Sequence, residues 1–344
     1  MRPVTRIWVS DVNTKQQHTL KNAINCSGVA LHSGVKVAMC LRPAPVDTGI
    51  VFHRTDLDAS VVDGNIDRSE TAKSDTLVPA RWDTVSDTIM STTICNDAGV
   101  KVATIEHLMA ALAGCGVDNV IVELNGPEVP IMDGSSAPFV FLIECSGREM
   151  QDARRRSIRV LRRVEIEDGD RRAVLLPSDG FSVSFEIDFD SAAIVEKTGF
   201  FDLHNGGFKR EICRARTFGF EREVNHLMDL GLAQGGSLDN AVVVGRDDEI
   251  MNEGGLRYGD EFVRHKVLDC VGDFYLAGGP LLAHFSGQRT GHTSNNQLMR
   301  KLFSDPANWE YSYDVPQPSS EPAASWDQPL RAVSKAATRV AATA

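Results

Sequence analysis

Three side chains that can bind a metal ion or move protons lie four residues apart in one segment. Apolar residues in Asp260–Tyr275 recur at helical spacing, so His265, Asp269 and Asp273 share one face of the predicted helix. An imidazole and a carboxylate one turn apart can bind the same divalent ion, at about 2 Å each. A solvated His–Asp pair on an exposed face is the alternative, and the spacing alone leaves both interpretations open.

A second candidate group, Glu106 and His107, lies in the first turn of another predicted helix. We expect Thr104 to cap this helix, which runs over Ile105–Ala113 and ends at Gly114. The positive end of a helix favours a carboxylate and a neutral imidazole, which is the form that binds a metal. The segment is not an H-E-x-x-H motif, because position 111 is alanine. Further ligands must therefore come from elsewhere, and a plain surface acid is the alternative for Glu106.

A third candidate, His292, follows a glycine in a predicted loop. A lone loop histidine is usually solvated and without a role. Beside the helical face described above, it becomes a candidate acid that Asp273 would orient.

Strands and helices alternate irregularly around these residues, which predicts an α+β fold. The clearest strand is Phe181–Phe189, where apolar and polar residues alternate, and a hairpin is expected around Asp168–Gly169. Other strands are predicted at 35–41, 91–95, 101–103 and 119–124, and other helices at 138–145 and 221–230. The polar, arginine-rich stretch 146–163 predicts a domain boundary, and the Pro-, Ser- and Ala-rich end predicts a disordered tail.

Composition limits the class of protein. The net charge of −11 argues against a general nucleic-acid-binding surface, since such a surface is basic. We expect no membrane span and no signal peptide, and therefore a cytoplasmic protein. The seven cysteines include no C-x-x-C pair, so the ligands of any zinc ion must be His, Asp or Glu.

Several longer motifs point to one family. The motifs are GVALHSG (Gly28–Gly34), LRPAP (Leu41–Pro45), TIEHLMAALAG (Thr104–Gly114), PIMDGS (Pro130–Ser135), CRARTFGF (Cys213–Phe220) and EFVRHKVLD (Glu261–Asp269). By these motifs, which appear in order and with matching intervals, the chain resembles the UDP-3-O-acyl-N-acetylglucosamine deacetylases over roughly residues 18–305. Members of that family are zinc enzymes of lipid A synthesis.

The resemblance implies two similar domains, each a β-sheet layered against two helices, with the active site between them. We expect an N-terminal extension at 1–17, domains at 18–150 and 151–312, and a tail at 313–344. A strand–helix–strand insert near 217–244 would build the acyl-chain passage, and its helix offers Val224, Leu227 and Met228 as an apolar face. Ordinary core packing is the alternative for that face.

The resemblance also implies the site and its chemistry. The metal is Zn²⁺, with Fe²⁺ as the alternative, because an imidazole–carboxylate set suits both. The implied zinc ligands are His107, His265 and Asp269, and the implied general base is Glu106. His292 would be the protonated partner of Glu106 and would be supported by Asp273, and Thr217 would donate a hydrogen bond to the oxyanion. The implied substrate contacts are Lys266, Phe218 and Leu31.

The implied reaction is removal of the N-acetyl group from a UDP-linked acyl amino sugar. The alternatives are a metal-dependent hydrolase of another amide or ester, and a binding protein without catalysis. A fused acyl dehydratase would need another full domain after residue 305, where only a short segment follows. We expect a monomer, and the alanine-rich end is either a protease handle or unselected disorder.

Overall fold

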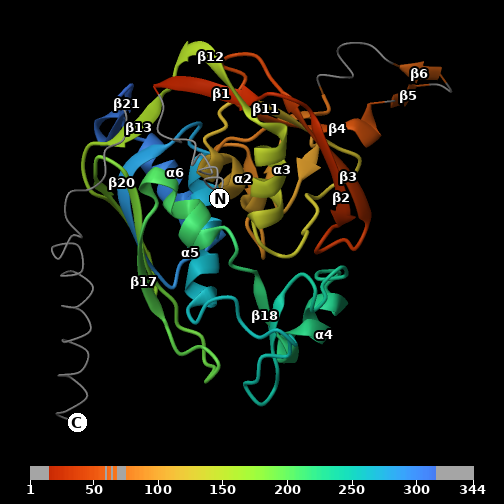
Figure 1. Cartoon of the computed structure of the whole chain (residues 1–344), viewed down its shortest axis with the longest axis vertical. Coiled ribbons are helices and arrows are strands. Elements are labelled where there is room, and N and C mark those ends of the chain that lie inside the picture. Colours follow the sequence, from red (N-terminus) through yellow and green to blue (C-terminus); the bar gives the residue numbers. More distant parts are fainter. Residues whose placement is uncertain (1–14, 59, 63–64, 68–74, 315–344) are drawn as a thin grey trace, which may run out of the picture.

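Two mixed β-sheets lie on either side of a group of central helices (Figure 1). The computed structural model describes residues 15–58, 60–62, 65–67 and 75–314. The predicted tail, apart from residues 313 and 314, lies outside the described residues, as do residues 1–14 of the predicted extension. The mixture of helices and sheets confirms the α+β class.

The first half of the chain forms a five-stranded sheet with the strand order β2-β3-β11-β4-β7. Its central strand, β11, runs antiparallel to β3 and parallel to β4. Alternate residues of β11 are buried, because one face of the sheet covers the core. The elements are β2 (Ile24–Val29), β3 (Lys36–Pro43), β4 (Ile50–Arg54), β7 (Leu77–Pro79), β11 (Val120–Leu124), α2 (Glu106–Cys115) and α3 (Ala137–Ser146).

The second half forms a seven-stranded sheet around β20. This strand runs antiparallel to β15 and parallel to both β13 and β16. The elements are β13 (Ser157–Val160), β14 (Val164–Asp168), β15 (Arg171–Pro177), β16 (Phe181–Glu186), β17 (Thr198–Asp202), β20 (Leu281–Gln288), β21 (Trp309–Ser312), α5 (Glu261–Tyr275) and α6 (His292–Phe303).

The two halves repeat one topology. The order β2-β3-β11-β4-β7 corresponds to β14-β15-β20-β16-β17, and each neighbouring pair has the same parallel or antiparallel sense in both halves. In each half one helix precedes the central strand and another follows it: α2 and α3 around β11, and α5 and α6 around β20. We propose a boundary between β12 and β13, since the predicted position at 150–151 falls inside β12.

The remaining elements lie outside the two large sheets and the four helices described above. The strands β18 and β19 pair in parallel and, with α4, project from the end of α5 (Figure 1). The remaining bounds are β1 (Gln16–Leu20), β5 (Ser60–Val62), β6 (Asn65–Asp67), β8 (Val85–Asp87), β9 (Thr93–Cys95), β10 (Lys101–Val102), β12 (Arg148–Arg154), β18 (Phe218–Phe220), α4 (Glu221–Asp229), β19 (Val242–Val244) and short helical turns at 55–57, 204–206, 208–212 and 306–308. No helix in the described ranges is long and apolar enough to cross a bilayer.

The ends of α2 differ from the prediction. Thr104 does not cap the helix, because its backbone is left-handed (φ 55°) and its hydroxyl donates to Glu128 instead. The helix also continues past Gly114 to Cys115 and is capped by Gly116, whose φ is 67°. Gly114 serves packing, since a Cβ there would lie 2.0 Å from the ring of Phe208. The strand predicted at 181–189 also ends earlier, at residue 186.

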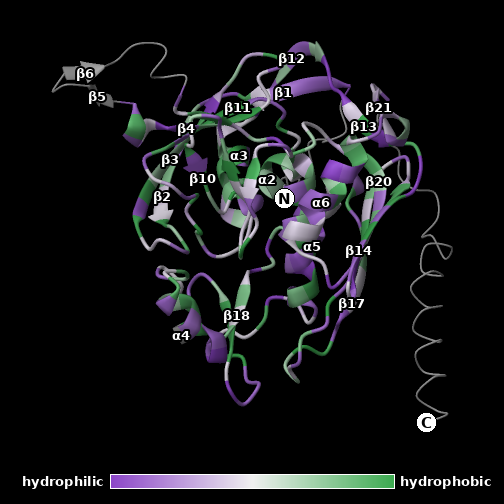
Figure 2. Ribbon diagram, turned by 180° about the vertical axis from the view of Figure 1, so that it is seen from behind, coloured by the Kyte–Doolittle hydropathy of each residue, from purple (hydrophilic) through white to green (hydrophobic). Residues whose placement is uncertain are grey.

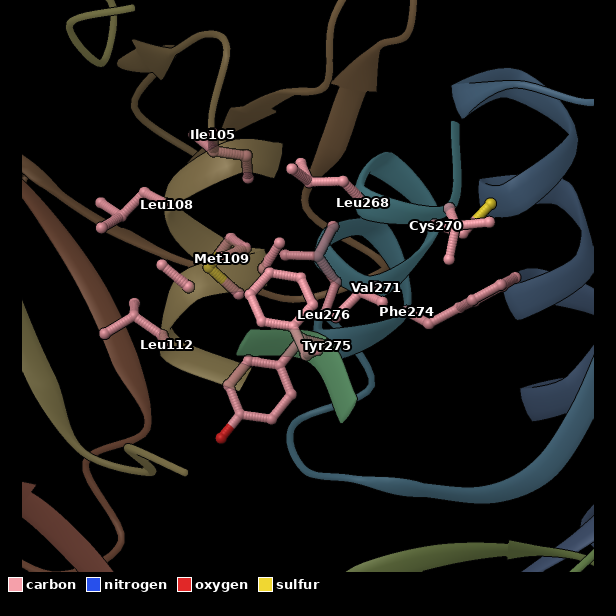
Figure 3. Close-up of a cluster of buried hydrophobic side chains, with 14 of the residues drawn as sticks. Ile105, Leu108, Met109, Leu112, Leu268, Cys270, Val271, Phe274, Tyr275 and Leu276 are labelled. Atoms are coloured by element: carbon pink, nitrogen blue, oxygen red, sulfur yellow. The ribbon is translucent and has the colours of Figure 1, made fainter. Parts of the chain in front are cut away.

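The helices α2 and α5 pack directly against each other and so join the two halves. Figure 3 shows apolar side chains of both helices meeting between them, among them Met109 of α2 and Leu268 of α5. The two backbones come close together at Gly272 of α5, where a Cβ would lie 2.1 Å from the carbonyl oxygen of Glu106. Only glycine therefore fits at this crossing.

Gly272→Ala should separate the two helices and destabilise the protein. A methyl group forced against backbone cannot be accommodated by a rotamer change, and overpacking costs about 1–3 kcal/mol or more. Thermal unfolding should show a lower midpoint for this variant. Gly259→Ala is the matched control because no atom lies within 4 Å of its added Cβ. Equal midpoints for both variants would contradict the proposed crossing.

Candidate metal centre

Two histidines and an aspartate from the two joined helices converge on one point. His107 lies in the first turn of α2, and His265 and Asp269 lie one turn apart on α5. Nε2 of His107 is 3.7 Å and Nε2 of His265 is 3.4 Å from Oδ1 of Asp269. Ligands of a tetrahedral zinc ion with bonds of about 2.0–2.1 Å lie roughly 3.3 Å apart. The three side chains therefore have the spacing of a metal site without further movement of the helices.

The hydrogen bonds of these side chains also fit a cation. Oδ1 of Asp269 is buried and has no hydrogen-bond partner among the described residues. Its other oxygen, Oδ2, accepts from Nζ of Lys266 at 2.7 Å. The ring of His265 is oriented by a contact of 3.2 Å between Nδ1 and the carbonyl oxygen of Ala215, which leaves Nε2 directed at Asp269. A buried carboxylate oxygen without a donor is costly unless a cation neutralises it.

Burial sets the protonation states that metal binding needs. It lowers the pKa of His107 to about 3 and lowers that of His265, so both imidazoles are neutral at pH 7. Burial opposes the charge of Asp269, but His265 and Lys266 outweigh it and hold the pKa of this carboxyl below its usual range. The set therefore offers two neutral nitrogens and one carboxylate, with side-chain exposures of only 4–5%.

Glu106 is next to His107 and is buried in the same site. Its Oε2 accepts from the backbone N–H of Thr92 at 3.0 Å. Burial raises its pKa to about 7, although nearby His292 opposes the shift. A carboxyl group with a pKa near 7 can both take up and release a proton at neutral pH.

His292 begins α6 and lies on the other side of Glu106, with 3.9 Å between its Nε2 and Oε1 of Glu106. Its Nδ1 is 2.8 Å from Oδ2 of Asp273. Burial opposes the charge of the ring, but Asp273 and Glu106 outweigh burial and raise the pKa of His292 to about 9. His292 is thus the positively charged imidazole of the site, while His107 and His265 are neutral.

A cavity of about 650 Å³ opens beside these groups. It is lined by Leu31, Thr217, Phe218 and Lys266, so the structure brings these four predicted residues together with His265, Asp269 and His292. Figure 2 colours most of α4 as hydrophilic. Its three apolar residues nevertheless line the same cavity, and Met228 remains 41% exposed, so this face is not ordinary core packing.

Three buried polar residues of the site were not found from the sequence. Thr92 and Asn295 both donate to Asp273. Glu128 accepts from the backbone N–H groups of His32 and Ser33 and so holds the loop that carries Leu31 at the cavity. Each of these residues bonds across more than 20 positions of the chain, a separation that no local spacing rule detects.

Comparison with known proteins identifies relatives along most of the chain. The family model of UDP-3-O-acyl N-acetylglycosamine deacetylase matches residues 17–304. A UDP-3-O-acyl-N-acetylglucosamine deacetylase of Pseudomonas entomophila (strain L48) is 51% identical over 297 residues, which cover 86% of this chain and 92% of the relative. One of Hahella chejuensis (strain KCTC 2396) is 50% identical over 297 residues, covering 86% and 93%. Every residue of the centre lies within the matched range.

His107→Ala and His265→Ala should each abolish stoichiometric metal binding, because two remaining ligands hold a divalent ion far more weakly than three. Elemental analysis of the purified variants measures this directly. His226→Ala is the matched control, since His226 is exposed on α4 and away from the converging ligands. Full metal content in either ligand variant would contradict the assignment.

Proposed function

The chain belongs to the UDP-3-O-acyl N-acetylglycosamine deacetylase family, and we propose that the centre between α2 and α5 performs that reaction. The chain is accordingly a deacetylase that hydrolyses the N-acetyl group of UDP-3-O-acyl-N-acetylglucosamine to give acetate and the free amine. The observation that carries this proposal is the convergence of three metal-ligand side chains with a buried acid and a charged imidazole.

We propose Zn²⁺ as the metal, held by His107, His265 and Asp269. A Zn²⁺ ion held by these residues would supply Lewis acidity for the acetyl carbonyl and would lower the pKa of a water molecule towards about 7. Fe²⁺ suits the same nitrogen and oxygen donors and is the alternative. Elemental analysis of the protein from its native cells decides between the two ions.

Glu106 is proposed as the general base. Its carboxylate takes the proton of the attacking water, and its pKa of about 7 lets it release that proton later in the cycle. The N–H of Thr92 holds one oxygen, Oε2, at 3.0 Å, so Oε1 is the oxygen free to act. Oε1 is also the oxygen that faces His292.

His292 and Thr217 are proposed to act on the charge that forms during attack. The imidazolium of His292 places a positive charge where the carbonyl oxygen becomes an oxyanion, and the hydroxyl of Thr217 donates to the same oxygen. The backbone of Thr217 is fixed, because its N–H donates to Gly134 and its carbonyl accepts from Val242. His292 can then pass its proton to the leaving amine.

The cavity is proposed to hold the rest of the substrate. Apolar side chains of α4 and of Phe218 suit a fatty acyl group, since apolar surface is removed from water there. Lys266 and Leu31 line the cavity near the metal ligands and are proposed to contact the sugar part. A cytoplasmic location, a monomeric state and recognition of the C-terminal tail by a protease stay predictions.

A deacetylation assay with zinc-loaded protein tests the function. Acetate and the free amine should form in equal amounts from UDP-3-O-acyl-N-acetylglucosamine. Glu106→Gln should lower kcat by about 10²- to 10⁴-fold, because the amide cannot accept the proton, while zinc content stays stoichiometric. Absence of acetate release by the zinc-loaded wild-type protein would refute the proposed function.

Asp273→Asn should move the basic limb of the activity profile to lower pH. Asp273, Glu106 and Asp269 are the acids that raise the pKa of His292, and the substitution removes the nearest of these negative charges. Activity that requires imidazolium is lost as pH rises through the pKa of His292, so a lower pKa means an earlier loss.

The pH dependence of kcat/KM measures this shift, with Asp97→Asn in an exposed turn as the control. An unchanged basic limb in Asp273→Asn would show that His292 is not the group responsible.

A further inference from the structure

We infer that Thr92 is a positioning residue that fixes Glu106 and His292 relative to each other, an inference that rests on the proposed function. Thr92 immediately precedes β9 and is only 2% exposed. Thr92 is itself neither a candidate metal ligand nor a residue of the cavity lining, so its contribution comes through the groups that it holds.

All three polar groups of Thr92 are engaged. Its N–H donates to Oε2 of Glu106 at 3.0 Å, and its carbonyl oxygen accepts from the N–H of Ile105 at 3.4 Å. Its hydroxyl donates to Oδ1 of Asp273 at 2.6 Å. The first two bonds fix the start of α2, and the third reaches α5. Thr92 therefore connects Glu106 in the first half with Asp273 in the second half. Asp273 in turn binds the imidazole of His292.

The hydroxyl controls the orientation of His292 through Asp273. Oδ2 of Asp273 is held by Nδ1 of His292 and by Nδ2 of Asn295, each at 2.8 Å. Oδ1 receives its hydrogen bond from Thr92 alone among the described residues, so this bond stops the carboxylate from turning about its Cβ–Cγ axis. The Thr92 hydroxyl is also 3.2 Å from Nδ1 of His292 and limits the tilt of the ring. Together these contacts keep Nε2 of His292 facing Glu106.

The segment around Thr92 is itself tied to α6, which makes it a firm support. The hydroxyls of Thr88 and Thr293 are 2.8 Å apart, and Nη2 of Arg300 donates to the carbonyl oxygen of Val85 at 3.1 Å. Threonine suits this position because its branched Cβ restricts χ1 and so directs the hydroxyl. A side chain whose supporting segment is held by further hydrogen bonds keeps the geometry that proton transfer needs.

The test compares Thr92→Val with Thr92→Ser in the zinc-loaded protein. Valine has the shape of threonine but no hydroxyl, and both variants keep the N–H that binds Glu106. Loss of a hydrogen bond to a charged group should lower kcat about 10- to 100-fold in Thr92→Val. KM should change less than about 3-fold, because Thr92 does not touch the cavity. Thr92→Ser should restore most of kcat.

Thr93→Val is the matched control, since it removes a hydroxyl from the next residue, which points to the other side of the strand. This variant should keep the wild-type kcat within about 2-fold. If Thr92→Val does not fold, Thr92→Ala removes the same donor without placing a methyl group beside Asp273.

A second readout does not depend on turnover. In the zinc-loaded protein, the Nδ1 proton of His292 should give a slowly exchanging low-field NMR signal in the wild type and Thr92→Ser, and a broadened one in Thr92→Val. Equal kcat and equal signals in the wild type and Thr92→Val would overturn the inference, as would equal losses in the serine and valine variants. An inactive wild-type enzyme would refute the proposed function instead, so the two failures are distinguishable.

Discussion

The close contact between α2 and α5 is the constraint on which the site depends. Of the three candidate metal ligands, α2 carries His107 and α5 carries His265 and Asp269, so neither half of the chain holds a complete set. Gly272 allows the backbones to approach because a Cβ there would lie 2.1 Å from the carbonyl oxygen of Glu106. A widening of this crossing by even one methyl group would move Glu106 and His107 together, away from His265 and Asp269. The packing at Gly272 therefore also sets the distances between the side chains of the candidate metal site.

Burial explains why charges occur in pairs around the centre. Removing a charge from water is costly unless a partner of opposite charge lies close by. Lys266 pairs with Asp269 at 2.7 Å, and His292 pairs with Asp273 at 2.8 Å. Glu106 has only an N–H donor on one oxygen and lies 3.9 Å from His292, so burial raises its pKa to about 7. The group without a close countercharge is thus the one poised to exchange a proton at neutral pH.

The sequence predicted the helices and strands better than the connections between them. The period of Asp260–Tyr275 placed His265 and Asp269 on one face, and α5 confirms that helix. The structure shows in addition that both residues are buried, which the spacing had left open. The pattern alone left His107 without partners, because the crossing of α2 and α5 depends on contacts more than 100 residues apart in the chain; the family motifs supplied that link. The role of Thr92 was missed for the same reason, since its bond to Asp273 spans 181 positions. The cap expected at Thr104 was wrong because a tertiary partner, Glu128, takes its hydroxyl.

The repeated topology shows how two similar halves can contribute differently to one centre. In each half a helix that carries one or two of the candidate metal ligands precedes the central strand, and a second helix follows the strand and begins close to the first. Near the start of α3, the hydroxyl of Ser136 donates to the backbone carbonyl of His107 and supports a ligand-bearing turn. At the corresponding place in the second half, α6 begins with His292, which faces Glu106. The same position in the fold therefore gives structural support in one half and a proton-bearing group in the other. The candidate site lies between the halves because Glu106 and His107 come from the first half, and His265, Asp269 and His292 come from the second.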